Sequence, residues 1–327
     1  MSPAPRLSSA PSPSTLSSGR YFILIVAFVL TWSSAFAVGK LSVQVSPPLL
    51  FLGLRFLLAG GIMLTWAHLS GRIPDLRAVA WGRLCLLGVL TQAGYIGLAW
   101  VAMERVSSAL TAIIISTNPI FIAALAKPVL GERVSFMRAL GLVLGLAGVA
   151  IVLRHRIVIS GEDAGGVALV LIALGSLVVG TLIYKKWSPR YPLAVLVGGQ
   201  FVGAGALLMA CGLAFESPLD MQLGFTFFWT LAYHVFVVSL GAIVLWFFLL
   251  ERMSATSASA FHFLMPPLGL AFGWLFLREP VDPSELIGIV PVAVGIWLVT
   301  QGDAIAARII ARSSLIRLRW RIKPPNP

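Results

Sequence analysis

The sequence predicts an all-α membrane protein with ten transmembrane helices, built as two five-helix repeats of inverted topology. Three observations support this fold class. Hydrophobic residues make up 58% of the 327 residues and charged residues only 11%, whereas a soluble domain normally carries about 25% charged residues. Apolar runs long enough to cross a bilayer recur along most of the chain. The second half of the sequence also repeats the first.

Ten segments have the roughly 20 mostly apolar residues that a transmembrane helix needs. The first repeat, residues 21–153, contains Tyr21–Val38, Pro48–Trp66, Gly82–Met103, Ser107–Leu130 and Arg138–Leu153. The second repeat, residues 165–300, contains Gly165–Tyr184, Pro192–Phe215, Phe228–Leu250, Ser254–Leu277 and Pro283–Thr300. The Ser- and Pro-rich residues 1–20 are expected to be a disordered cytoplasmic tail.

Positive charge predicts the orientation of the helices. Most of the 24 Lys and Arg residues fall on the side of the N-terminus, and the other side holds only Lys40, Arg105, Arg154, Arg156 and Arg278. Because cytoplasmic connections are enriched in Lys and Arg, we expect a multi-pass protein of the cell inner (plasma) membrane with both termini in the cytoplasm.

The basic C-terminal tail, residues 301–327, alternates apolar residues with arginines. Two interpretations stay open: an amphipathic helix on anionic lipids of the inner leaflet, or an anchor that only sets topology. The net charge of +12 does not indicate a nucleic-acid partner, because the basic residues stand in short connections and tails. We expect a monomer.

A shift of 147 residues aligns the two halves without a gap. Matches between apolar residues carry little weight, but matched charged residues, prolines and glycines are rare by chance. The shift places Glu104-Arg105 on Glu251-Arg252, Pro119 on Pro266, Glu132 on Glu279, Gly141 on Gly288 and Gly148 on Gly295. Because each repeat has an odd number of helices, the copies must enter the membrane from opposite sides, as in many secondary transporters.

With these residues the chain resembles members of the drug/metabolite transporter superfamily, EamA type, which includes bacterial amino-acid and metabolite exporters. The resemblance is carried by Trp32 to Phe36, by Pro47-Pro48 with Arg55-Phe56, and by the block from Trp100 to Gly148 with its second copy. It spans about residues 21–300. It implies ten helices, cytoplasmic termini, a central cavity between the repeats, and export or exchange of small metabolites.

Arg55 is the only formally charged side chain well inside an apolar run. It lies about eight residues past Pro47, or roughly 12 Å into its helix. A charge at this depth is costly and marks a functional site by default. Two roles stay open: bidentate binding of a substrate carboxylate, or pairing with carbonyl groups at a neighbouring helix end.

Polar and aromatic residues in six other predicted helices are candidates for substrate binding. They can bind a small amphipathic solute, but serines also allow close helix packing, and a lone histidine can be satisfied structurally. Proline-interrupted helices at matching places in the two halves point to the binding region. The candidates are Trp32, Ser33, Ser34, Gln92, Tyr95, Thr117, Asn118, Gln200 and His262, with His234 as a weaker one.

A second group is assigned to gating or structure. An acidic residue in a tight turn complements the N-terminus of the next helix, and a proline within a membrane helix usually kinks it. A gating salt bridge is the alternative role for the acid–base pairs. The group comprises Glu104, Arg105, Pro119, Glu251, Arg252 and Pro266.

The sequence gives no reason to expect an enzyme, a metal site or a cofactor. It lacks a nucleophile–base arrangement, a His-Glu-x-x-His motif and a P-loop. Cys85 and Cys211 lie in apolar runs and are interpreted as small buried residues. We expect a secondary carrier, an exporter or facilitator of small metabolites such as amino acids, working by alternating access. Export of lipophilic cations or neutral metabolites is the alternative, and a non-transporting scaffold or a membrane enzyme is the alternative of another class.

Overall fold

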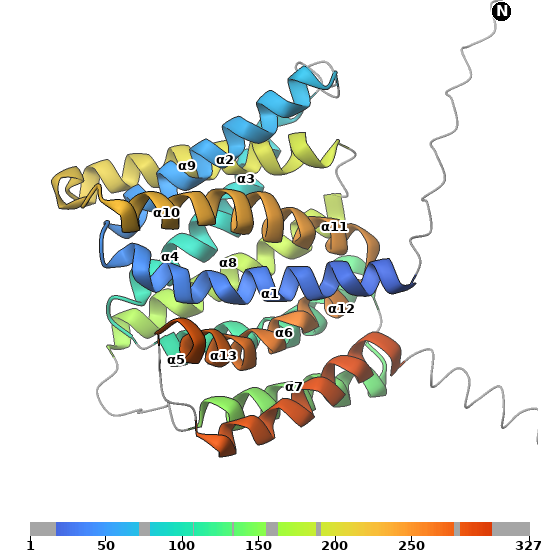
Figure 1. The fold of residues 1–327 in the computed structure, drawn as a ribbon. Helices are drawn as coiled ribbons and strands as arrows, with labels where there is room; N and C mark the ends of the chain where they lie inside the picture. Colours follow the sequence, from blue (N-terminus) through green and yellow to red (C-terminus); the bar gives the residue numbers. More distant parts are fainter. Residues whose placement is uncertain are drawn as a thin grey trace, which may run out of the picture.

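A computed structural model describes residues 18–71, 79–106, 108–132, 134–154, 163–187, 191–277 and 282–302, and every structural statement below refers to these ranges. The described residues form helices that pack side by side, and no strand occurs among them (Figure 1). The predicted tails lie almost wholly outside the described residues. Large apolar side chains on the outside of the bundle, such as Phe22, Trp66 and Trp274, are more than half exposed, as expected for groups that face lipid.

The first repeat contains α1 (Ser18–Val43) and α2 (Pro48–Leu69), then one long run made of α3 (Trp81–Gly88), η2 (Val89–Gly97) and α4 (Leu98–Ala102). It ends with α5 (Ser108–Ser116), α6 (Asn118–Leu130) and α7 (Phe136–Leu153). Gly131 stops α6 by adopting a left-handed conformation with φ 72°, which glycine takes without steric cost. Ser135 starts α7, because its side chain accepts a hydrogen bond from the backbone N–H of Arg138.

The second repeat contains α8 (Ala164–Trp187), α9 (Leu193–Phe215), and a long run of α10 (Phe225–Tyr233), η4 (His234–Ile243) and α11 (Val244–Arg252). It continues with α12 (Ala255–Ser259), η5 (Ala260–Leu264), α13 (Met265–Leu277) and the final helical run Pro283–Gly302, which opens with η6 (Pro283–Gly288). A short turn, η3 (Pro218–Asp220), lies between α9 and α10.

Nine helical runs in the described ranges are long and apolar enough to cross a membrane. The tenth predicted span, Ser254–Leu277, is helical but changes to a tighter 3₁₀ turn at η5, so it is not one continuous helix. The ten predicted spans are therefore confirmed as helical segments. The ends differ by a few residues, most of all for α1, which extends to Val43.

Irregular turns recur at matching places in the two repeats. The shift of 147 residues carries the π-helical segment η2 onto residues 236–244, which nearly coincide with the second π-helical segment, η4. It also carries Thr117, which separates α5 from α6, onto Leu264, the last residue of η5. The repeat is thus a repeat of backbone conformation as well as of sequence.

The first two helices of each repeat match at a shift of 145 residues instead. This shift places Pro47 on Pro192, and each of these prolines is the N-cap of its helix, α2 or α9. It also places Lys40 on Lys185, Gly53 on Gly198 and Gly60 on Gly205. This second relation is hidden when the two halves are aligned without a gap at the shift of 147 residues.

Pseudo-equivalent helices pack against each other through glycines at two edges of the bundle. In Figure 1, α2 lies beside α9 at one edge, and α7 lies beside the final helix at the other. A Cβ atom on Gly148 would lie 2.7 Å from the carbonyl oxygen of Gly288, and one on Gly288 would lie 2.5 Å from that of Gly148. Gly141 and Gly295 are related in the same way, because a Cβ atom added to either glycine would lie 2.6 Å from the carbonyl oxygen of the other.

The order of these contacts gives the direction of the helices. Gly141 meets Gly295 while Gly148 meets Gly288, so one helix runs up as the other runs down. The repeat relation places Gly141 on Gly288 and Gly148 on Gly295, so it converts each of these two contacts into the other, as in an interface with two-fold symmetry. These contacts are what an inverted-topology repeat requires.

Candidate functional site

A cavity with about 530 Å³ of empty space, part of it open to the outside, lies between helices of both repeats. It reaches Met103, just after α4, and Thr111, near the start of α5, and we call this end of the bundle the mouth end. Its walls come from α1, α2, η2, α4, α5 and η4. The lining residues are Trp32, Ala35, Arg55, Tyr95, Ile96, Ala99, Trp100, Met103, Thr111, Ile115, His234, Val238 and Ile243.

Arg55 places a guanidinium in this wall with incomplete hydrogen bonding. The residue is only 2% exposed. Its Nε donates to Ser239 Oγ at 2.9 Å, its carbon Cζ lies 4.8 Å from the ring centroid of Phe56, and Nη2 has no hydrogen-bond partner. None of the lining residues is acidic. A buried cation whose N–H group has no hydrogen-bond acceptor is costly in free energy unless an anion accepts that hydrogen bond. The geometry therefore suits an anionic group inside the cavity.

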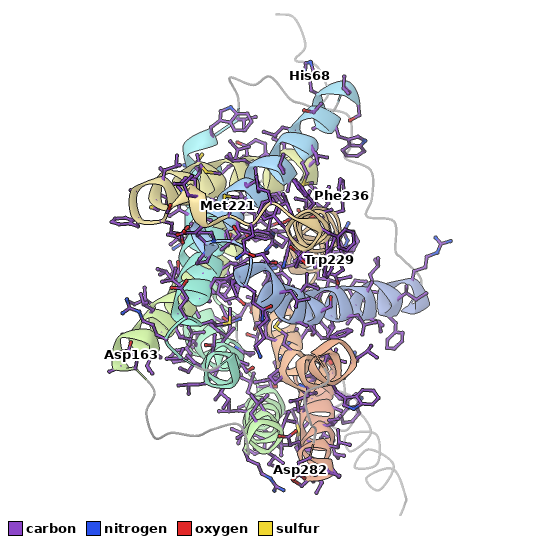
Figure 2. The ribbon with its side chains drawn as sticks, turned by 60° about the vertical axis from the view of Figure 1, so that its left-hand side comes forward. His68, Asp163, Met221, Trp229, Phe236 and Asp282 are labelled. Atoms are coloured by element: carbon purple, nitrogen blue, oxygen red, sulfur yellow. The ribbon has the colours of Figure 1, made fainter. Side chains whose placement is uncertain are left out.

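His234 stands beside Arg55 in the cavity wall at the start of η4. It is fully buried, and neither ring nitrogen has a hydrogen-bond partner. The rings of Phe51 and Trp100 hold it edge-on, at centroid distances of 5.7 and 5.5 Å. Phe236 lies on the outer face of the same segment (Figure 2) and is 59% exposed. From the sequence, His234 was a weaker candidate than His262. The rings around His234 come from residues distant in the sequence, so the residues next to it do not reveal them.

Both π-helical segments contribute to the walls. Tyr95 and Ile96 come from η2, and His234, Val238 and Ile243 come from η4. Ser239, the acceptor for Arg55, also lies on η4. π-helical turns occur frequently at functional sites, and here the pair flanks one cavity. No periodicity in the sequence indicated them.

Trp32 separates the cavity from a second buried aromatic group. Its ring centroid lies 6.5 Å from that of Trp246 and 6.1 Å from that of His262. Trp246 and His262 contact each other at 5.0 Å. Trp32 lines the cavity, whereas the other two do not.

Three of the ten predicted substrate-binding residues line the cavity: Trp32, Arg55 and Tyr95. The other seven do not: Ser33, Ser34, Gln92, Thr117, Asn118, Gln200 and His262. Ser34 Oγ forms a 2.6 Å hydrogen bond with the Tyr233 hydroxyl, and Thr117 Oγ donates to the Ile114 carbonyl oxygen. These two residues connect helices or satisfy backbone groups.

Gln92 and Gln200 belong to a polar group between η2 and α9. Thr91 Oγ donates to Gln200 Oε1 at 3.3 Å, and Gln92 Nε2 donates to Thr91 Oγ at 3.3 Å. Asn118 is fully buried, and its amide atoms have no hydrogen-bond partner. His262 Nδ1 lies 3.0 Å from the Ser259 carbonyl oxygen, whereas its Nε2 has no hydrogen-bond partner.

The predicted gating residues occupy the helix ends. Arg252 forms a salt bridge with Glu251 at 3.4 Å, and Glu251 Oε1 accepts a hydrogen bond from the Tyr184 hydroxyl. Pro119 and Pro266 are the second residues of α6 and α13, so the chain is interrupted just before each proline and not kinked at it. Arg105 packs against the start of α8 at Gly166.

Glu104 and Glu216 form an acidic pair at the mouth end. Burial, together with the nearby charge of Glu216, raises the pKa of the Glu104 carboxyl group, and Arg105 opposes this effect. Glu216 accepts hydrogen bonds from the backbone N–H groups of Leu49 and Leu50, both at 2.9 Å. It therefore caps α2 behind Pro47, a role that the sequence did not reveal.

The model of the EamA-like transporter family matches residues 19–154 and again residues 164–301. The chain belongs to this family. Both matched ranges correspond to the two structural repeats described above.

Related proteins carry transporter names. "Uncharacterized transporter YvbV" of Bacillus subtilis is 31% identical over 288 residues, covering 86% of this chain and 91% of the relative. "Uncharacterized inner membrane transporter YedA" of Escherichia coli K12 is 26% identical over 284 residues, covering 86% and 90%. One solved crystal structure shares the fold, with a TM-score of 0.72, 18% identity, and coverage of 85% of this chain and 96% of that one. This chain is therefore a multi-pass membrane protein of a transporter family.

Proposed function

We propose that this protein is a secondary carrier that exports or facilitates the movement of small metabolites bearing a carboxylate, with amino acids and related amphipathic compounds as the first candidates. The observation that carries the proposal is the buried guanidinium of Arg55, with its vacant Nη2, in a cavity without acidic lining residues. A substrate carboxylate would complete the hydrogen bonding of Arg55. His234 adds a second polar group next to it.

The remaining walls suit an apolar or aromatic substrate body. Trp32, Tyr95 and Trp100 present large ring surfaces, and Ile115 and Val238 are apolar. Lipophilic cations are disfavoured, because a cation would meet Arg55 without an acidic partner. Neutral metabolites would leave the guanidinium unpaired.

Alternating access is the proposed mechanism, because the inverted repeats supply two related halves around one cavity. From the distribution of Lys and Arg we further propose a location in the cell inner membrane with both termini in the cytoplasm. The mouth end of the bundle then lies on the outer side of the membrane. A monomer whose basic tail contacts anionic lipids completes the proposal.

The test is uptake of a labelled panel of carboxylates, amino acids, neutral metabolites and lipophilic cations into proteoliposomes, with empty liposomes as the control. Saturable uptake of carboxylates, accelerated by the same compound preloaded inside, is the expected result. Uptake confined to lipophilic cations would refute the proposed substrate class. Absence of uptake for every compound, with protein shown to be folded, would favour the scaffold.

A further inference from the structure

His234 leaves a hydrogen-bond acceptor in the cavity wall that a carboxylate cannot satisfy. The side chain is fully buried, and neither ring nitrogen has a partner among the residues that the structure describes. Because Arg55 is positively charged and none of the described lining residues is acidic, a second positive charge here would be costly, so the ring acts in its neutral form. A neutral imidazole has one nitrogen that donates and one that accepts. A carboxylate can pair with the first, but the second needs an N–H or O–H group.

Aromatic packing, and not hydrogen bonding, holds the His234 ring in place. The ring centroids of Phe51 and Trp100 lie 5.7 and 5.5 Å from it, and both rings meet it edge to face. The Tyr233 ring lies 6.1 Å away in the same kind of arrangement. Buried polar atoms are normally paired. Unpaired nitrogens on a ring that packing holds in a cavity wall therefore indicate a ligand that pairs with them.

The unpaired atoms of His234 and Arg55 belong to one region of the wall. Ser239, which accepts a hydrogen bond from Arg55 Nε at 2.9 Å, lies five residues after His234 on the π-helical segment η4. Since the hydrogen bonds of a π-helix join residues i and i+5, these two side chains lie on one face of η4, about one turn apart. A ligand whose carboxylate pairs with Arg55 Nη2 therefore meets His234 with a group close to that carboxylate. In a small metabolite this group is the substituent on C2, the carbon next to the carboxylate.

We propose that His234 determines substrate specificity by accepting a hydrogen bond from an N–H or O–H group on C2, so that the carrier selects 2-amino and 2-hydroxy carboxylates over 2-oxo carboxylates and carboxylates with an unsubstituted C2. This inference rests on the proposed function and specifies the substrate class of the same site. Arg55 pairs with the carboxylate whatever C2 carries. A 2-oxo group has only acceptor atoms and leaves the acceptor nitrogen of His234 unpaired, which is costly in a buried site.

The test uses ligands that share one body and differ only at C2. The first set is leucine, 2-hydroxy-4-methylpentanoate, 4-methyl-2-oxopentanoate and 4-methylpentanoate, and a second set carries a phenyl ring in place of the isopropyl group. Binding to the purified full-length protein in detergent is measured by isothermal titration calorimetry. The same ligands are then tested for uptake into proteoliposomes.

Three variants separate the hydrogen bond from the packing of the ring. His234→Phe keeps an aromatic ring between Phe51 and Trp100 but has no nitrogen. His234→Gln carries an amide with both a donor and an acceptor. His262→Phe is the matched control, because His262 is also buried but does not line the cavity. A melting measurement on each variant controls for unfolding.

The unchanged protein should bind the 2-amino and 2-hydroxy acids at least about tenfold more tightly than the other two acids of the same set. His234→Phe should bind all members of a set with similar dissociation constants. His234→Gln should regain part of the preference, which a purely structural role of His234 would not produce. His262→Phe should keep the whole preference, and Arg55→Gln should weaken the binding of every member by a similar factor.

Equal dissociation constants within each set for the unchanged protein would overturn the inference, and so would an undiminished preference in His234→Phe. Equal binding would mean that water satisfies the acceptor nitrogen. Absence of binding for every ligand would also overturn it. The uptake measurement separates these results from a failure of the proposed function. Carboxylate uptake without a C2 preference would leave the carrier standing and remove the role of His234, whereas preferential binding without uptake would do the reverse.

Discussion

Replacement of Gly148 by alanine tests the glycine contact between the two repeats. A Cβ at this position would lie 2.6 Å from the backbone nitrogen of Val292 and 2.7 Å from the carbonyl oxygen of Gly288. Both atoms belong to backbone, which cannot rotate away, so α7 and the final helix must separate by roughly 1 Å. Overpacking of this kind costs about 1–3 kcal/mol, against a gain of about 1 kcal/mol in helix propensity.

The matched control is Gly175→Ala in α8, where an added Cβ meets nothing within 4 Å. This variant should keep the propensity gain of up to about 1 kcal/mol. Thermal unfolding in one detergent, followed by size-exclusion chromatography, should therefore rank Gly175→Ala at or above the unchanged protein and Gly148→Ala below it.

The reciprocal variant Gly288→Ala should behave like Gly148→Ala, because its Cβ would lie 2.5 Å from the Gly148 carbonyl oxygen. The double variant should cost less than the two single variants added together, since one separation of the helices accommodates both methyl groups. If Gly148→Ala is as stable as Gly175→Ala, the reasoning about this interface is wrong.

Two further predictions concern Arg55 and the mouth end. Ser239→Ala removes the acceptor of the Arg55 Nε–H and leaves a second vacant donor on the guanidinium. It should therefore lower the free energy of unfolding by about 1–3 kcal/mol. A variant as stable as the unchanged protein in the same thermal assay would contradict the assigned hydrogen bond. The raised pKa of Glu104 means that the folded state favours its protonated form, so this group's contribution to stability is present at low pH and is lost as pH rises above the ordinary range of glutamate. Melting temperatures measured between about pH 4 and 8 should show this loss of stability, and the loss should be smaller in Glu104→Gln. Identical pH profiles of melting temperature for the two proteins would refute the raised pKa of Glu104.

The fold could be predicted well from the sequence, because a helix that crosses the bilayer needs a long run of apolar residues. Runs of about 20 apolar residues identify spanning helices, and Glu104-Arg105 repeated as Glu251-Arg252 identified the second copy. The relation of α1 and α2 to α8 and α9 was missed, because its shift of 145 residues differs by two from the shift of 147. A single ungapped comparison cannot find both.

The site was predicted less completely, for a physical reason. In a helix that is apolar all round, no hydrophobic face tells which side meets a cavity. Gln92 and Tyr95 both lie in η2, yet only Tyr95 lines the cavity. Arg55 was found because a charge within an apolar run is costly wherever it points. His234 was undervalued because its surroundings come from Phe51 and Trp100, far away in the sequence.

The central claim is that the Arg55 guanidinium binds a substrate carboxylate, and one comparison tests it most directly. Transport of a carboxylate found in the uptake panel is measured against its carboxamide analogue, in proteoliposomes with the unchanged protein and with Arg55→Gln. Loss of a charge-assisted hydrogen bond of about 1.5–3 kcal/mol should lower carboxylate transport by roughly 10- to 100-fold, while transport of the carboxamide changes little. Folded Arg55→Gln that transports the carboxylate at the unchanged rate would contradict the account.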